Sequence, residues 1–127
     1  MANPINHLLD STSVYFLASN EQPALALIST PLNDSNYHSW SQTMLLVLRM
    51  KNKVGFVDGS LPRPVVECPT QMAWDRCNKF VSSWIIQSLD PSLVPSERMN
   101  TGFEVWFDLK HRFCQHDMSK GGVASRK

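Results

Sequence analysis

The stretch Asn36-Tyr37-His38-Ser39-Trp40 opens the first of three segments in which large apolar side chains recur at helical spacing. Met44 and Leu48 follow Trp40 at steps of four residues. That spacing places the three side chains on one face of an α-helix. The pattern therefore predicts a helix over residues 37–52.

The residues around this segment carry signals for the start and the end of a helix. Asp34, Asn36 and Ser39 are each able to accept a hydrogen bond from the first free amides of the helix. Gly55 is expected to end the helix, and Lys53 is expected to point to solvent near its C-terminus.

The strongest helical pattern lies between Thr70, a candidate N-cap, and the helix-breaking pair Asp90-Pro91. Two tryptophans and several aliphatic residues fall on one face at alternating steps of three and four. Burying that face contributes on the order of 10 kcal/mol before the loss of conformational entropy is counted. This segment is expected to be the central helix of the fold.

A third helix is expected from Thr101 onward. Glu104 follows Thr101 by three residues, which permits a capping box, in which each side chain bonds the backbone amide of the other residue. Asp108 and Arg112 are one helical turn apart and are expected to form an ion pair.

These segments predict an all-α fold, a small bundle of about three main helices within one domain over 14–118. The apolar run 24–28 is expected to be a short strand or an extended strap on the helices, and the proline-rich residues 61–69 a linker. Residues 1–13 and 119–127 are expected to be disordered. The predicted core consists of Tyr37, Trp40, Met44, Leu48, Phe56, Trp74, Cys77, Val81, Trp84, Ile85, Val105, Trp106, Leu109 and Phe113.

Composition limits the classes of function. The chain has 127 residues, enough for one domain, and a formal net charge of +1. A nucleic-acid-binding module usually carries a basic excess, so direct nucleic-acid contact is disfavoured. Three cysteines without a repeated spacing favour free thiols in a reducing compartment. Because no run approaches the roughly 20 apolar residues of a membrane span, we expect a cytoplasmic protein without a membrane partner.

Few residues are suited to chemistry. His111 and Cys114 are one helical turn apart, but a structural zinc site needs four ligands and no second pair has matching spacing. Cys77 lies on an apolar helix face, where a thiol is usually inert. No phosphate-binding glycine loop, nucleophile elbow or paired-carboxylate motif is present in the sequence. The sequence thus predicts no enzyme, no metal, no cofactor and no small-molecule substrate.

The irregular spacing of the tryptophans distinguishes the chain from Myb-like DNA-binding domains, which space three tryptophans regularly beside a basic helix. The order of motifs instead resembles the Gag polypeptide of copia-type LTR retrotransposons of plants. The similarity extends from about Val14 to Met118, and no single motif is specific. It is carried by the ordered series Leu32–x–x–x–Asn36-Tyr37–x–x–Trp40, Gly55-Phe56-Val57-Asp58-Gly59-Ser60, Trp74–x–x–Cys77-Asn78, Ser83-Trp84-Ile85 and Val105-Trp106–x–Asp108-Leu109.

The resemblance implies an all-helical module from the N-terminal part of Gag, the protein that assembles into the particle shell around the RNA of the element. Its expected partners are copies of itself or a longer Gag protein. Three hypotheses follow: an assembly module that self-associates, a truncated or captured fragment that binds full-length Gag without assembling alone, and a nucleic-acid-binding adaptor. Complete Gag proteins carry further helices and often a zinc knuckle, neither of which is expected in these 127 residues.

Overall fold

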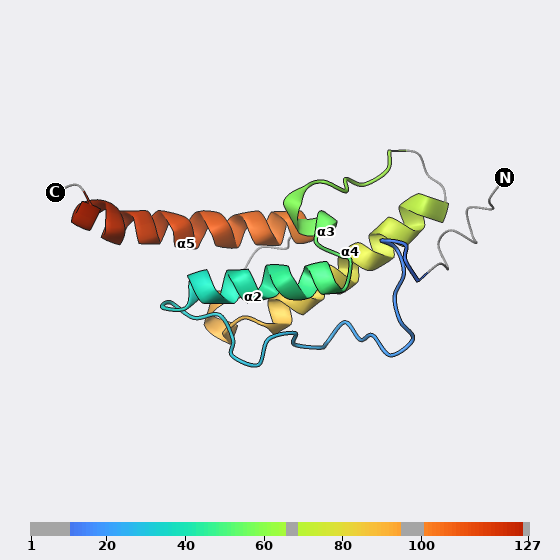
Figure 1. The fold of residues 1–127 in the computed structure, drawn as a ribbon, viewed down its shortest axis with the longest axis horizontal. Helices are drawn as coiled ribbons and strands as arrows, with labels where there is room; N and C mark the ends of the chain where they lie inside the picture. The colour runs from blue at the N-terminus through green and yellow to red at the C-terminus, as the bar shows by residue number, and fades with distance from the viewer. Residues whose placement is uncertain (1–10, 66–68, 95–100, 126–127) are drawn as a thin grey trace.

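The computed structural model describes residues 11–65, 69–94 and 101–125. They form helices α2 (Tyr37–Met50), α3 (Gly55–Asp58), α4 (Pro69–Gln87) and α5 (Gly102–Ser125), and a 3-10 helix, η1 (Pro91–Leu93). Figure 1 shows α4 crossing behind α2, with α5 along one edge of the molecule. The short helix α3 contacts the start of α5, which also packs on α4. The prediction of an all-α bundle with three main helices is confirmed.

The residues before α2 form an extended strap over α4. Figure 1 shows residues 11–32, in blue, running in the same direction as that helix. The strap ends in an isolated parallel bridge between Leu32 and Leu89, where the Leu32 amide donates to the Ser88 carbonyl at 2.9 Å. Of the two alternatives for residues 24–28, the strap is therefore the one that the structure shows.

The C-terminus of α2 differs from the prediction that Gly55 ends it. Asn52 adopts the left-handed conformation (φ 60°), and the amide of Lys53 donates to the Leu48 carbonyl at 2.7 Å. The Asn52 amide bonds the Arg49 carbonyl at 3.0 Å, which completes a Schellman motif. Asparagine tolerates this conformation because its side chain is short and polar, so the chain turns three residues before the glycine.

The short helix α3 is followed directly by Gly59, which has φ 84°. Glycine adopts this left-handed conformation without steric cost. A β-carbon at Gly59 would lie 3.3 Å from the ring of Phe103 on α5. Glycine at this position thus permits both the left-handed turn and the close packing of α5.

The starts of α4 and α5 follow the sequence signals to different degrees. Helix α4 already includes Pro69, so Thr70 lies inside the helix rather than at its N-cap. Proline suits the first helical position because its missing N–H has no partner there. At α5, Thr101 Oγ1 accepts from the Glu104 amide and Glu104 Oε1 accepts from the Thr101 amide, each at 3.0 Å. The predicted capping box is confirmed.

Helix α5 continues to Ser125, beyond Met118, where the sequence predicted the start of a disordered tail. Once a helix has formed, each further residue adds one backbone hydrogen bond, and a glycine weakens the helix by only about 1 kcal/mol. Gly121 and Gly122 therefore do not by themselves end it. Residues 126–127 lie outside the described residues, as do residues 1–10, and the domain boundaries stay a prediction.

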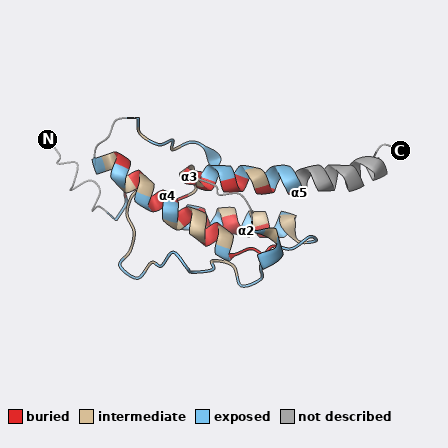
Figure 2. Ribbon diagram, turned by 180° about the vertical axis from the view of Figure 1, so that it is seen from behind, coloured by how far each residue is buried: buried red, intermediate tan, exposed pale blue. Residues whose placement is uncertain are grey.

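The core lies where α2, α3, α4 and α5 meet, as the buried faces in Figure 2 show. All of the predicted core residues are buried except Tyr37, which is partly exposed and packs against the core. Leu32, Val57 and Leu89 are also buried in it. Leu32 comes from the strap and Leu89 from the residues after α4, so residues outside the helices complete the helical core.

Candidate functional site

Three residues of the motif that begins at Leu32 lie at the junction between the strap and α2, namely Leu32, Asn36 and Trp40. Leu32 is fully buried, and Asn36 holds the turn before α2 by donating to the Pro31 carbonyl and accepting from the Asn33 amide. Asn36 is the N-cap by position, but its side chain makes no capping bond. The pattern thus encodes the attachment of the strap to the helices.

Ser88 is the polar centre of this junction. Its carbonyl accepts from the Trp40 indole at 3.0 Å and from the Leu32 amide. Its hydroxyl donates to the Trp84 carbonyl at 2.9 Å and accepts from the Leu27 amide at 3.2 Å. Because Ser88 is fully buried, each of these bonds satisfies a group that water cannot reach.

Stacked aromatic rings join α2 to α5. The Tyr37 and Phe113 rings are nearly parallel at 5.3 Å, and the Trp40 and Trp106 rings stack at 5.8 Å. Since the earlier residue of α2 meets the later residue of α5, the two helices run in opposite directions, as Figure 1 shows. Such pairs contribute about 0.5–1.5 kcal/mol each beyond the area they bury.

Two further indoles bind extended segments to α4. Trp84 donates to the Gln22 carbonyl in the strap at 2.8 Å, and Trp74 donates to the Leu61 carbonyl in the linker at 2.9 Å. Ser83 also donates to the Pro23 carbonyl. Tryptophan on α4 therefore anchors a loop with its N–H while its ring fills the core.

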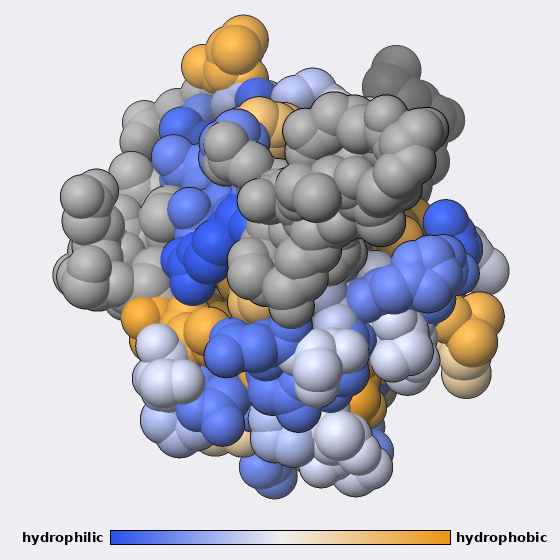
Figure 3. Space-filling model, turned by 90° about the vertical axis from the view of Figure 1, so that its left-hand side faces the viewer, coloured by the Kyte–Doolittle hydropathy of each residue, from blue (hydrophilic) through white to orange (hydrophobic). Residues whose placement is uncertain are grey.

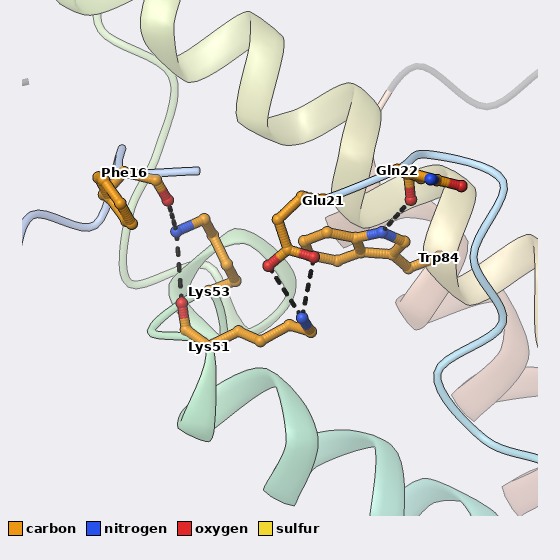
Figure 4. A network of polar contacts seen from close by, with 6 residues as sticks. All are labelled: Phe16, Glu21, Gln22, Lys51, Lys53 and Trp84. Atoms are coloured by element: carbon orange, nitrogen blue, oxygen red, sulfur yellow. Dashed lines mark hydrogen bonds and ion pairs between the residues drawn. The ribbon is translucent and has the colours of Figure 1, made fainter. Parts of the chain in front are cut away.

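A polar clamp, made of Glu21, Lys51 and Lys53, fastens the strap to the end of α2 (Figure 4). Lys53 is only 2% exposed, in contrast to the expectation that it points to solvent. Its ammonium group donates to the Phe16 carbonyl at 2.6 Å and to the Lys51 carbonyl at 3.3 Å. The Schellman turn reverses the chain after α2, and this reversal carries Lys53 inward. Burial lowers the pKa of Lys53 below its ordinary value of 10.5.

Lys51, the second lysine of the clamp, contacts the strap and the core together. Its ammonium group lies 2.9 Å from a Glu21 carboxylate oxygen and 5.0 Å from the centre of the Trp84 ring. Figure 4 shows the Lys51 ammonium group directed at the Glu21 carboxylate, with the Trp84 indole close by. The cation–π contact adds about 0.5–1 kcal/mol at a partly exposed site. The clamp is structural, because each of its groups is engaged within the chain.

The outer side of α5 carries an aromatic ladder, which we define as Phe103, Phe107 and His111. Adjacent rings stack at 6.1 Å and 6.3 Å, and Phe107 is 59% exposed. Beside Phe103 lies a largely apolar groove of about 320 Å³. Its lining comprises Phe56, Gly59, Leu61, Pro62, Arg63, Trp74, Thr101 and Phe103.

Hydrophobic side chains also reach the surface away from the ladder. Leu46 and Met50, one turn apart on α2, are 56% and 76% exposed. Figure 3 shows that hydrophobic side chains form separate orange spots between hydrophilic ones on the face seen there. The ladder differs from these spots because its three rings contact one another in sequence along one helix.

The residues considered for chemistry do not come together. Burial raises the pKa of the Cys77 thiol, which donates to the Tyr15 carbonyl at 3.3 Å, so the thiol is protonated and inert at neutral pH. His111 belongs to the ladder, and the Cys114 side chain lies outside the described residues. Within residues 11–65, 69–94 and 101–125, no group of three His, Cys, Asp or Glu side chains is placed to hold a metal ion.

Sequence reasoning missed the buried position of Lys53 and the roles of Ser88 and Asn78. The Asn78 side chain, which belongs to α4, accepts from the Gly102 amide at 2.8 Å. It thus provides a hydrogen-bond partner for a free amide at the start of α5. Sequence reasoning also missed the aromatic ladder. Its signal was available, since Phe103, Phe107 and His111 recur at steps of four on the side opposite the buried residues of α5.

None of the helices in the described part of the chain has the length and apolar character needed to cross a membrane. No curated protein and no solved structure matches the chain. Residues 18–65 match the family model of the Gag-polypeptide of LTR copia-type. The matched segment spans most of the strap, α2, α3 and the start of the linker, and includes the junction built around Leu32, Asn36 and Trp40. The resemblance to the Gag-polypeptide of LTR copia-type is therefore confirmed over residues 18–65.

Proposed function

We propose that this chain is a structural, non-catalytic module that mediates protein–protein assembly of a copia-type Gag. The family match over residues 18–65 carries this proposal, because it coincides with the junction that sets the fold. The expected partners are a second copy of the chain or a longer Gag protein.

The surface of the molecule supports contact with protein. Phe103 and Phe107 on α5 are large apolar side chains that the fold leaves exposed. Aromatic residues are enriched at protein–protein interfaces. The nearly balanced charge, twelve Lys and Arg against eleven Asp and Glu, favours protein over nucleic acid as the partner. We also propose a cytoplasmic setting, supported by the free thiol of Cys77 and by the absence of a disulfide spacing in the sequence.

The test is the solution mass of the purified chain, measured by light scattering over a concentration series. We expect the mass to rise from that of one copy, 14.4 kDa, toward that of two or more. A mass that stays at one copy at all concentrations would overturn autonomous assembly.

A second measurement then separates the remaining hypotheses. Titration of the chain with a full-length copia-type Gag would show binding if the longer protein is its partner. Titration with single-stranded RNA at several salt concentrations would show a steep loss of affinity with salt if the chain were a nucleic-acid adaptor. Absence of both self-association and binding to the full-length Gag would reject the assembly function altogether.

A further inference from the structure

Apart from the packing of Phe103 at Gly59, the ladder on α5 lies outside the buried core. Val105, Trp106, Leu109 and Phe113 face the core and are buried, while Phe103 and Phe107 are 45% and 59% exposed. Figure 1 shows α5 along an edge of the molecule, and Figure 2 shows exposed residues along its outer side. The two exposed phenylalanines, four residues apart, form an apolar patch in contact with water. Burying this patch against a second apolar surface would be favourable.

Charged residues beside the ladder are arranged with opposite signs about Phe107. Glu104 precedes Phe107 by three residues and Lys110 follows it by three, and both are exposed. Phe103 and His111 are likewise four residues to either side. If the direction of the helix is reversed about Phe107, Lys110 takes the level of Glu104 along the helix. Likewise, His111 takes the level of Phe103.

We propose that the ladder is a self-association surface on which the α5 helices of two copies pair antiparallel, with the two Phe107 side chains at a two-fold axis. A rise of about 1.5 Å per residue places Glu104 and Lys110 about 4.5 Å along the helix on either side of that axis. Glu104 of one copy then lies at the level of Lys110 and His111 of the other. Phe103 lies at the level of the same two residues.

Charge complementarity identifies the occupant as a second copy. In a parallel pair Glu104 would face Glu104 and Lys110 would face Lys110, which is unfavourable. In the antiparallel pair both contacts are between opposite charges, and they occur twice by symmetry. The groove beside Phe103 extends the apolar surface from α5 onto Leu61 and Pro62. This inference rests on the proposed assembly function and names the surface that assembly uses.

The experiment compares the dimerisation constant of the wild type with those of two matched variants by light scattering or sedimentation. We expect Phe107→Glu to weaken dimerisation roughly 30-fold or more, because it removes a central aromatic anchor and places two like charges at the two-fold axis. Met50→Glu is the control, since it adds the same charge at an exposed apolar residue of α2. It is expected to leave dimerisation within about twofold of the wild type.

Charge reversal then tests the orientation. Lys110→Glu is expected to weaken dimerisation about fivefold, because it brings Glu104 opposite a second carboxylate. The double variant Glu104→Lys/Lys110→Glu restores opposite charges in the antiparallel pair and is expected to recover most of that loss. The thermal midpoint of each variant is measured in parallel, because Glu104 also belongs to the capping box.

The outcomes distinguish this inference from the function on which it rests. A wild type that never associates overturns the proposed autonomous assembly and the surface with it. A wild type that associates equally well with Phe107→Glu, or loses association in Met50→Glu, overturns the surface alone. Loss in Lys110→Glu without recovery in a folded double variant overturns the antiparallel pairing.

Discussion

Three tryptophan side chains in this protein each have two roles. The ring fills the core, and the indole N–H holds a neighbouring segment by a hydrogen bond. Trp40, Trp74 and Trp84 are buried, and each indole N–H donates to a backbone carbonyl outside its own helix. A buried carbonyl without a partner costs about 1–3 kcal/mol. Losing one indole therefore leaves both a cavity and an unsatisfied carbonyl or a freed loop.

We expect Trp84→Ala to lower the free energy of unfolding by about 3–5 kcal/mol, because Trp84 is fully buried. Trp84→Phe keeps an aromatic ring but removes the donor to Gln22 and should cost less. Urea unfolding measures both changes. Leu46→Ala, at an exposed residue of α2, is the control and should remain within about 0.5 kcal/mol of the wild type. A comparable loss at Leu46 would contradict the burial of Trp84 as the cause.

Lys53 makes a second prediction, on the pH dependence of stability. Its pKa is lowered in the folded chain by burial of the ammonium group. The unfolded chain thus binds more protons between the lowered pKa and 10.5, and the contribution of Lys53 to stability rises with pH across that window. It is fully present above pH 10.5 and is lost as the pH falls through the folded pKa.

The measurement is the difference in unfolding free energy between the wild type and Lys53→Met from pH 7 to pH 10.5. We expect that difference to shift in favour of the wild type as the pH rises. Lys51→Met is the comparison, because Lys51 is less buried and paired with Glu21. A difference that is constant with pH, or that shifts toward the variant, would show that Lys53 is not desolvated in the folded state.

At the scale of elements, the helices begin and end through local motifs that differ in how far the sequence reveals them. The capping box of Thr101 and Glu104 is local and was predicted from the sequence. The turn that ends α2 uses a left-handed Asn52. The sequence signal for the end of the helix was the glycine three residues later. Asn78 supplies a further acceptor to the start of α5 from α4, across 24 residues of chain.

Thr101→Ala is expected to lower the unfolding free energy by about 1 kcal/mol, because the Glu104 amide loses its acceptor at the start of α5. Thr101→Ser retains the hydroxyl and should recover most of this loss. Thermal unfolding of the three proteins measures both effects. If the serine variant were as destabilised as the alanine variant, packing of the threonine methyl group rather than capping would be responsible.

For the molecule as a whole, the strap is part of the folded unit. It contributes Leu32 to the core and receives hydrogen bonds or ion pairs from Lys51, Lys53 and Trp84. These contacts are with α4 and with the end of α2, so the strap joins elements that are distant in sequence. The family match includes most of the strap and ends before α4. In each contact between the two, it therefore covers the residue of the strap but not the residue of α4.

We expect Leu32→Ala to lower the unfolding free energy by about 2–5 kcal/mol, because Leu32 is fully buried. Leu25→Ala is the matched control in the same strap, since Leu25 is 43% exposed, and should cost well under half as much. A single cooperative urea transition in both variants would show that strap and helices unfold together. Equal effects of the two substitutions would contradict the docking of the strap at Leu32.

The sequence by itself determined the helices and their buried faces, because amphipathic spacing and the capping box are local properties of the chain. Periodicity identified Trp40, Met44 and Leu48, and all three are buried. Only the tertiary structure decided the environment of Lys53, the anchoring of the strap on Ser88, and the placing of the ladder on an exposed edge. These features arise where segments far apart in sequence meet, and the burial of a polar group or the exposure of an apolar one depends on which segment lies against it.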